Sequence, residues 1–125
     1  MRVLRQGHRR DGDLAAMSVS EAEYQLSGNA LLVRGTLSHQ EQAPLGRALR
    51  ELIDSGHEDP TLDLTGVDQL SSACAAQIML AMLWMRQRNR SLLVRAGPQE
   101  FRTLQIAGAE SLGTLELVRT PPALP

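Results

Sequence analysis

The sequence predicts an α/β fold: one domain with a mixed central sheet of about five strands and three to four helices packed on it. Short segments rich in Leu and Val alternate with segments whose apolar residues recur every three to four positions. This alternation is typical of a largely parallel sheet whose connections are helices. The chain has 125 residues, of which 42% are hydrophobic and 22% charged, which suits a single globular core.

The first part of the chain predicts an extension followed by two strands. Residues 1–16 are rich in Arg, Gly and Asp without an apolar period, so we expect a mobile extension before a domain at 17–119. Residues 21–26 alternate weakly and predict a first strand. A turn signal at 27–29 separates it from a second strand at 30–34, which is rich in Leu and Val.

A first helix follows, and two starting points fit its sequence. Ser38 and Glu41 have the spacing of a capping box. Pro44 is tolerated only in the first turn of a helix, so a start near Gln42 or Ala43 is the alternative. The apolar residues at helical spacing are Leu45, Leu49, Leu52 and Ile53.

A strand, a loop and a serine-capped helix form the centre of the chain. Residues 61–64 predict the strand, and Thr65–Gly66 predicts its end. Ser71 or Ser72 is the expected N-cap, because a serine hydroxyl accepts a hydrogen bond from a free helix N–H group. The helix should continue to about Asn89.

The remainder predicts a strand, a helix, a strand and a tail. The strands are expected at 91–95 and 114–118. The helix should begin at Pro98 and end at Gly108. Residues 120–125 form a proline-rich tail.

The central helix is apolar almost all round. The positions expected to face the sheet are Ala75, Ile78, Met82 and Met85. Leu80 and Trp84 fall roughly opposite, which indicates an exposed surface for a partner or for a homodimer. The alternative is that Trp84 lies under the N-terminal extension or the C-terminal tail.

A family resemblance centres on the same segment. Asp63–Ala73 reads Asp-Leu-Thr-Gly-Val-Asp-Gln-Leu-Ser-Ser-Ala and resembles the signature of STAS domains, the anti-sigma factor antagonist family. Residues 31–37 resemble the second strand of that family, and 98–104 followed by Gly108 resemble its last helix. The similarity spans about 24–118 and implies a STAS-like fold.

The resemblance also implies a function. In the family, the serine that matches Ser72 is phosphorylated by a kinase that is also the anti-sigma factor. Here Ser71 replaces the acidic residue before that serine, and Ala73–Cys74 replaces the glycine after it, so Ser72 and Ser71 are both candidate phosphorylation sites. The expected partner-binding residues are Asp68, Ser71, Ser72, Leu80 and Trp84. The alternative is an unphosphorylated STAS adaptor in a lipid-transport, chemotaxis or stress-signalling assembly.

Composition argues against several other classes. A net charge of −1 and only three aromatic residues disfavour a nucleic-acid binder. No apolar run approaches the ~20 residues of a membrane span, and no signal peptide is visible. A single cysteine fits a reducing cytoplasm.

The sequence predicts no enzyme, metal site or cofactor. Cys74 would lie in a first helical turn, where a thiol can be reactive, but we interpret it as a small buried residue. The sequence places no base beside it among the three histidines, His8, His39 and His57. Asp63 and Asp68 are too few ligands to indicate a metal.

Overall fold

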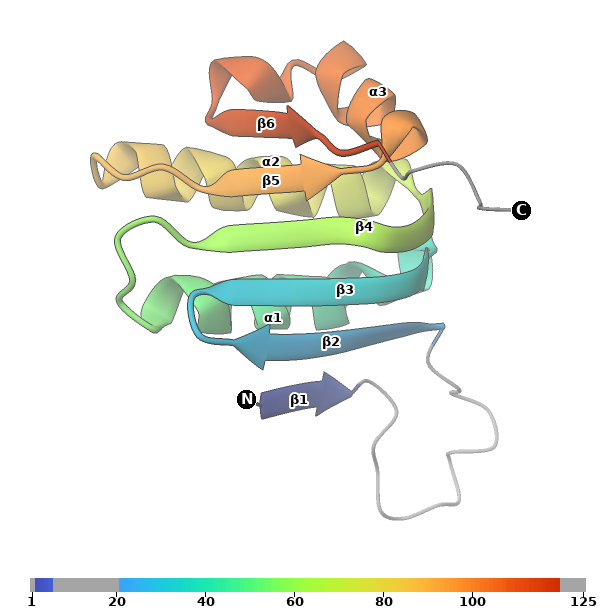
Figure 1. Cartoon of the computed structure of the whole chain (residues 1–125), viewed down its shortest axis with the longest axis horizontal. Helices are drawn as coiled ribbons and strands as arrows, with labels where there is room; N and C mark the ends of the chain where they lie inside the picture. The colour runs from blue at the N-terminus through green and yellow to red at the C-terminus, as the bar shows by residue number, and fades with distance from the viewer. Residues whose placement is uncertain (1, 6–20, 120–125) are drawn as a thin grey trace.

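Six strands form a single sheet in which their spatial order is their sequence order, β1-β2-β3-β4-β5-β6 (Figure 1). The computed structural model describes residues 2–5 and 21–119. The strands are β1 (Arg2–Arg5), β2 (Ala22–Ser27), β3 (Ala30–Leu37), β4 (Thr61–Leu70), β5 (Leu93–Ala96) and β6 (Thr114–Leu117). The helices are α1 (Gln42–Asp54), α2 (Ser72–Gln87) and α3 (Pro98–Ile106), with 3-10 turns η2 (His39–Glu41) and η3 (Ala109–Ser111).

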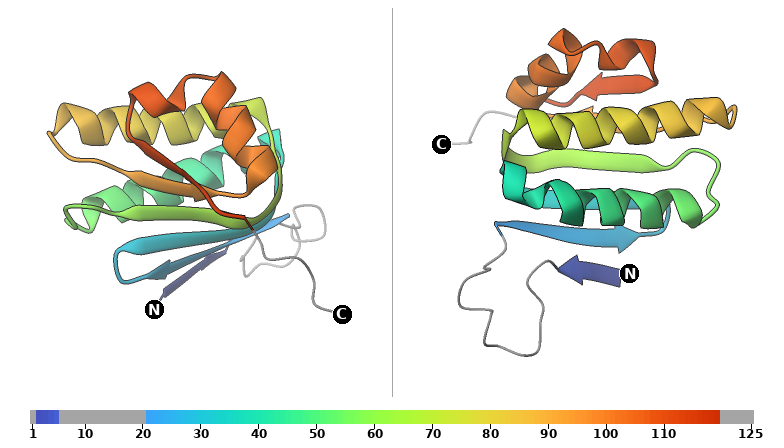
Figure 2. Two further views of the ribbon diagram at one scale, coloured as in Figure 1. Left: turned by 45° about the horizontal axis from the view of Figure 1, so that its top comes forward. Right: turned by 180° about the vertical axis from the view of Figure 1, so that it is seen from behind.

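The sheet is mixed, as predicted. β1 and β2, and likewise β2 and β3, pair antiparallel, whereas β3, β4, β5 and β6 run parallel. Each parallel pair is joined by one crossover helix, because parallel neighbours cannot be linked by a tight turn. α1 and α2 lie side by side on one face of the sheet, and α3 lies towards its β6 end (Figure 2, right).

The core lies between the sheet and the α1–α2 layer. The predicted inner face of α2 is confirmed, because Ala75, Ile78, Met82 and Met85 are all buried. The strands contribute alternate apolar side chains, as a sheet with one covered face requires. Those with less than 2% of their surface exposed include Leu31, Val33, Leu62, Leu64 and Val94.

The strand β4 does not end where the sequence predicts. It continues past Thr65–Gly66 to Leu70 instead of stopping at Leu64. Two register shifts along β3 accommodate the irregular residues, and the Asp63 carboxylate accepts hydrogen bonds from the N–H and hydroxyl of Thr65, at 2.9 and 2.6 Å. A side chain at Gly66 would come within 2.9 Å of the Arg34 side chain, so the glycine permits close pairing.

The capping-box start of the first helix is wrong, and the alternative start at Gln42 is confirmed. Ser38 makes no cap; its hydroxyl donates to Glu21 Oε1 at 2.5 Å. Glu41 turns inwards and is only 3% exposed. Its carboxylate accepts from the Tyr24 hydroxyl at 2.7 Å and from the Glu21 N–H at 3.2 Å. A buried tyrosine hydroxyl requires a hydrogen-bond acceptor, so Glu41 binds Tyr24 instead of capping the helix.

The N-terminal segment also differs from the expected extension. Residues 2–5 form β1, paired with β2 from Arg2 opposite Leu26 to Arg5 opposite Glu23. The rest of the expected extension and the tail at 120–125 lie outside the described residues.

Candidate functional site

The two serines at the start of α2 have different roles. Ser71 is the N-cap: its hydroxyl accepts from the Cys74 N–H at 3.2 Å, and its own N–H donates to the Leu37 carbonyl at 2.9 Å. Ser72 is the first helical residue and is exposed. Of the two predicted candidates, Ser72 is therefore the accessible hydroxyl, whereas Ser71 fixes the helix start to the end of β3.

Cys74 is fully buried one turn further on, which confirms its interpretation as a small core residue. Its Sγ lies 3.3 Å from the Ser38 carbonyl oxygen, to which the thiol donates. Burial raises the pKa of the Cys74 thiol, and the nearby Glu41 charge adds to this rise, while the hydrogen bond with Ser71 opposes it. The thiol is therefore protonated at neutral pH and is not an activated nucleophile.

A pocket of about 270 Å³ opens beside Ser71, at the carboxyl ends of the parallel strands. This strand-end pocket is lined by Leu37, Asp68, Gln69, Leu70, Ser71, Gln99, Glu100 and Thr103. Two of its side chains are carboxylates. Asp68 is exposed and accepts from the Thr36 hydroxyl at 2.9 Å, and Glu100 is 6% exposed in the first turn of α3. The pocket is thus acidic.

A second depression, of about 320 Å³, lies between the two helices that cover the sheet. This α1/α2 groove is lined by Gln42, Ala43, Gly46, Arg47, Leu49, Arg50, Ile53, Gln77, Leu80, Ala81 and Trp84. Leu80 is 47% exposed, and Trp84 is half-buried. The guanidinium carbons of Arg50 and Arg88 lie 4.7 and 5.7 Å from the centre of the Trp84 ring. These distances are those of cation–π contacts.

The five predicted partner-binding residues thus divide between two places. Asp68 and Ser71 line the strand-end pocket, and Leu80 and Trp84 line the α1/α2 groove. Ser72 lies between them, because Ser72, Ala76 and Leu80 are exposed at successive intervals of four residues along α2. This exposed line on α2 connects the pocket with the groove.

Sequence reasoning missed the contributions from the other helices. Glu100 and Thr103 reach the pocket from α3, and Gly46 and Arg50 reach the groove from α1. A glutamate in the first turn of a helix that begins with Pro98 is a recognisable signal, but it points equally to helix capping. For Arg50 no local signal exists, because it lies on the polar side of its own helix.

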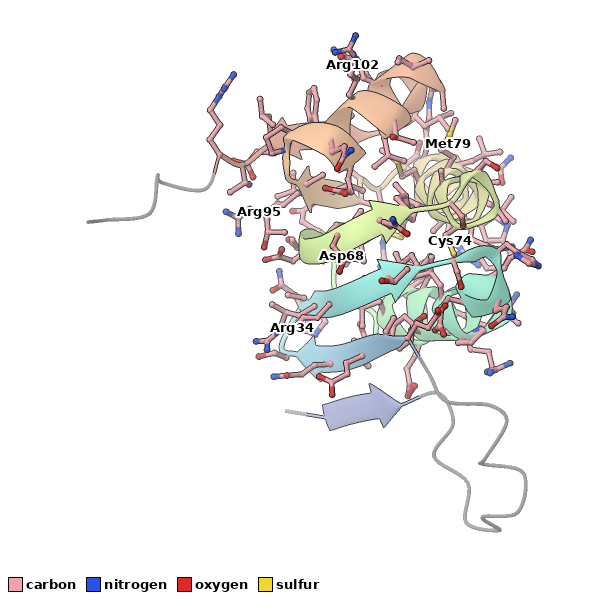
Figure 3. All side chains as sticks on the ribbon, turned by 90° about the vertical axis from the view of Figure 1, so that its right-hand side faces the viewer. Arg34, Asp68, Cys74, Met79, Arg95 and Arg102 are labelled. Atoms are coloured by element: carbon pink, nitrogen blue, oxygen red, sulfur yellow. The ribbon has the colours of Figure 1, made fainter. Side chains whose placement is uncertain are left out.

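Charged side chains also gather on the sheet face that α1 and α2 leave open. Figure 3 shows Arg34, Asp68 and Arg95 on this side, whereas Cys74 and Met79 lie on the helix side. Arg95 lies 3.6 Å from Asp63 and 3.0 Å from Glu116. Asp63 is therefore an ion-pair partner of Arg95 and the hydrogen-bond acceptor of Thr65.

The part of the chain that the structure describes contains neither a metal-ligand cluster nor a helix suited to cross a membrane. No cluster of three or more His, Cys, Asp or Glu side chains there is arranged to hold a metal ion. None of the helices formed by residues 21–119 has the length and apolar content needed to cross a membrane.

Solved structures share this fold at low sequence identity. A crystal structure of TM1081 from Thermotoga maritima, provisionally described as an anti-sigma factor antagonist, has a TM-score of 0.59 and 10% identity over 79% of this chain and 86% of that one. An NMR structure of the protein TM1081 has a TM-score of 0.59 and 11% identity over 76% of this chain and 79% of that one. No curated protein sequence matches the chain significantly.

The sequence itself matches a family model over most of its length. The model is that of the family described as "Mlab, STAS domain", and it covers residues 22–123. This range includes the strand-end pocket, α2 and the α1/α2 groove. The chain therefore belongs to the STAS domain family.

Proposed function

We propose that this protein is a non-enzymatic regulatory module that binds a kinase-type anti-sigma factor through the Ser72 turn and the outer face of α2. The observation that carries the proposal is the exposed line on α2, which runs from Ser72 to Leu80 and ends at the α1/α2 groove. A partner laid along this line would contact the serine and the groove together. The similarity to a provisionally described anti-sigma factor antagonist supports this kind of partner.

Ser72 is the residue that a kinase would modify. Its side chain is exposed, whereas the Ser71 hydroxyl already accepts the Cys74 N–H. A phosphate would add roughly 1.5 to 2 negative charges at the start of α2. The helix N–H groups would favour it, but Asp68 and Glu100 line the adjoining pocket and would repel it. Phosphorylation would therefore weaken the docking of an apolar partner surface at this end of α2, because that surface would have to cover a charged, hydrated phosphate.

The second candidate is an unphosphorylated adaptor in a lipid-transport, chemotaxis or stress-signalling assembly. One observation favours it: Ser71 stands where the family signature has an acidic residue, and its hydroxyl is used to cap α2. In this case the same surface binds a partner, but Ser72 carries no phosphate.

One set of experiments separates the two candidates. The full-length protein is mixed with a kinase-type anti-sigma factor from the same genome, with Mg-ATP, and is followed by gel filtration and phosphopeptide mass spectrometry. The first proposal expects a complex, a phosphate on Ser72 and none in Ser72→Ala. A complex that forms without phosphate, and that Ser72→Ala leaves unchanged, supports the adaptor. If no complex forms and no phosphoserine is found, the anti-sigma proposal is wrong.

A further inference from the structure

We propose that the α1/α2 groove is the docking site for an acidic amphipathic helix of a partner protein. The inference deepens the proposed function, since it rests on this protein being a protein-binding module and names the chemistry of the segment that binds. The groove is also open: Figure 2 (right) shows α1 and α2 side by side in front of the sheet, with no described element over them.

The shape and lining of the groove suit apolar side chains at helical spacing. Leu49, Ala81 and Trp84 contribute apolar lining, and the half-exposed Leu80 lies at its edge. A side chain at Gly46 would come within 2.9 Å of the Gln77 amide oxygen. Gly46 therefore lets the Gln77 side chain of α2 pack closely against α1. A helix presenting apolar residues at i, i+3, i+4 and i+7 fits such a groove.

The charges around the groove select an acidic partner. The ionisable side chains that line it are Arg47 and Arg50, and no carboxylate does so. Arg88 adds a third cation, because it stacks on the same Trp84 ring as Arg50. Among the described residues, Arg50 and Arg88 have no carboxylate partner within ion-pair distance, whereas Arg95 has two. Glutamates flanking an apolar stripe would supply the missing anions.

The same charges argue against a second copy of this chain as the occupant. In a dimer with twofold symmetry, a surface patch meets the same patch of its partner. Such an arrangement would bring Arg50 and Arg88 towards the same arginines of the second copy, and like charges repel. A heterologous acidic helix meets no such opposition.

Trp84 is the only tryptophan of the chain, so its fluorescence reports on the groove. The probe is a synthetic helical peptide of about 18 residues with leucines at i, i+3, i+4 and i+7 and glutamates on both flanks. The matched control peptide has glutamine at every glutamate position. Both are titrated into the full-length protein, and isothermal calorimetry checks the affinity independently of the fluorescence change.

We expect the glutamate peptide to bind with saturation and to shift the Trp84 emission. The dissociation constant should rise about tenfold or more for the glutamine peptide, and about tenfold for Arg50→Glu with Arg88→Glu. Arg102→Glu is the matched control, because Arg102 is exposed on α3 and does not line the groove. The affinity of this variant for the glutamate peptide should stay within about twofold of that of the unchanged protein. Circular dichroism confirms that each variant is folded.

Several results would overturn the inference. Absence of binding, equal binding of the two peptides, or equal weakening by Arg102→Glu would each do so. A dimer that Arg50→Glu dissociates would assign the groove to a second copy. A gain in peptide affinity on removing residues 120–125 would assign it to the chain's own C-terminal segment.

The test distinguishes a failure of this inference from a failure of the proposed function. Ser72 does not line the groove, so Ser72→Ala should leave the affinity for the peptide unchanged. If an anti-sigma partner binds with an affinity that Arg50→Glu and Arg88→Glu leave unchanged, this inference fails and the proposed function stands. If the peptide binds but no anti-sigma partner does, this inference stands and the proposed function fails.

Discussion

The two faces of α2 both contain apolar residues but differ in burial. Towards the sheet, Cys74, Ile78 and Met82 are completely buried. Away from it, Ser72 and Leu80 are exposed. Ile78 and Leu80 are equally apolar and only two positions apart, which places them about 200° apart around the helix axis. Helical phase, more than residue type, therefore decides which residues stabilise the fold and which remain available to a partner.

The outer face is itself divided by charge. At its N-terminal end it meets the acidic strand-end pocket with Asp68 and Glu100, and further along it meets the groove with Arg47 and Arg50. A partner that lies along the helix would have to present basic groups near one end and acidic groups near the other. Such opposed charges fix the direction of binding as well as its strength.

The largest expected effect separates the two faces by stability. Ile78→Ala should lower the free energy of unfolding by about 2–5 kcal/mol, because it leaves a cavity in a fully buried position. Leu80→Ala should cost less than about 1 kcal/mol, since the side chain is already half exposed. Chemical denaturation followed by circular dichroism measures both. Equal losses would show that Leu80 is covered.

The pH dependence of stability tests the inner face through Cys74. Burial raises the pKa of this thiol in the folded protein, whereas a cysteine in the unfolded chain has a pKa of about 8.5. The stabilisation from the protonated Cys74 thiol is complete below that pH. It is lost as the pH rises from the unfolded pKa to the folded pKa. The loss of stability contributed by this one proton cannot be steeper than about 1.4 kcal/mol per pH unit.

Cys74→Ala provides the control for this prediction. The variant should lose the decrease in the free energy of unfolding that begins at about pH 8.5. It should keep the decrease caused by Tyr24, because burial and Glu41 raise the pKa of this tyrosine above its unfolded value of about 10. Urea denaturation at a series of pH values measures the difference. Parallel curves for the two proteins would contradict the assignment.

The two serines should differ by a smaller amount. Ser71→Ala removes the N-cap of α2 and should cost about 1 kcal/mol. Ser72→Ala changes an exposed side chain and should stay within about 0.5 kcal/mol. Thermal unfolding of both variants measures this, and a reversed order would mean that Ser72 is the cap.

The smallest effect concerns the basic side of the outer face. Arg50→Gln removes a cation from the Trp84 ring and should lower stability by about 0.5 kcal/mol. Arg102→Gln, on α3, should change stability less. If Arg50→Gln cost several kcal/mol, the arginine would be a structural residue and not one available to a partner.

The sequence by itself determined the order of the elements from β2 to β6 and the phase of α2. Periodicity depends on neighbours three or four positions apart, so it correctly predicted that Ile78 and Met82 face the sheet. The signature around Ser71 and Ser72 likewise placed the start of the helix, because capping is a local interaction.

Only the tertiary structure decided what distant residues do for one another. Glu41 has the spacing of a capping residue, but the buried Tyr24 hydroxyl, 17 positions away, takes its carboxylate. Likewise, Arg50 reaches Trp84 only because α1 and α2 pack side by side. Glu100 reaches the pocket beside Ser71 only because the starts of α2 and α3 lie close together at the carboxyl ends of the parallel strands. Hydrogen-bond satisfaction and charge placement depend on neighbours in space, and local sequence patterns do not contain them.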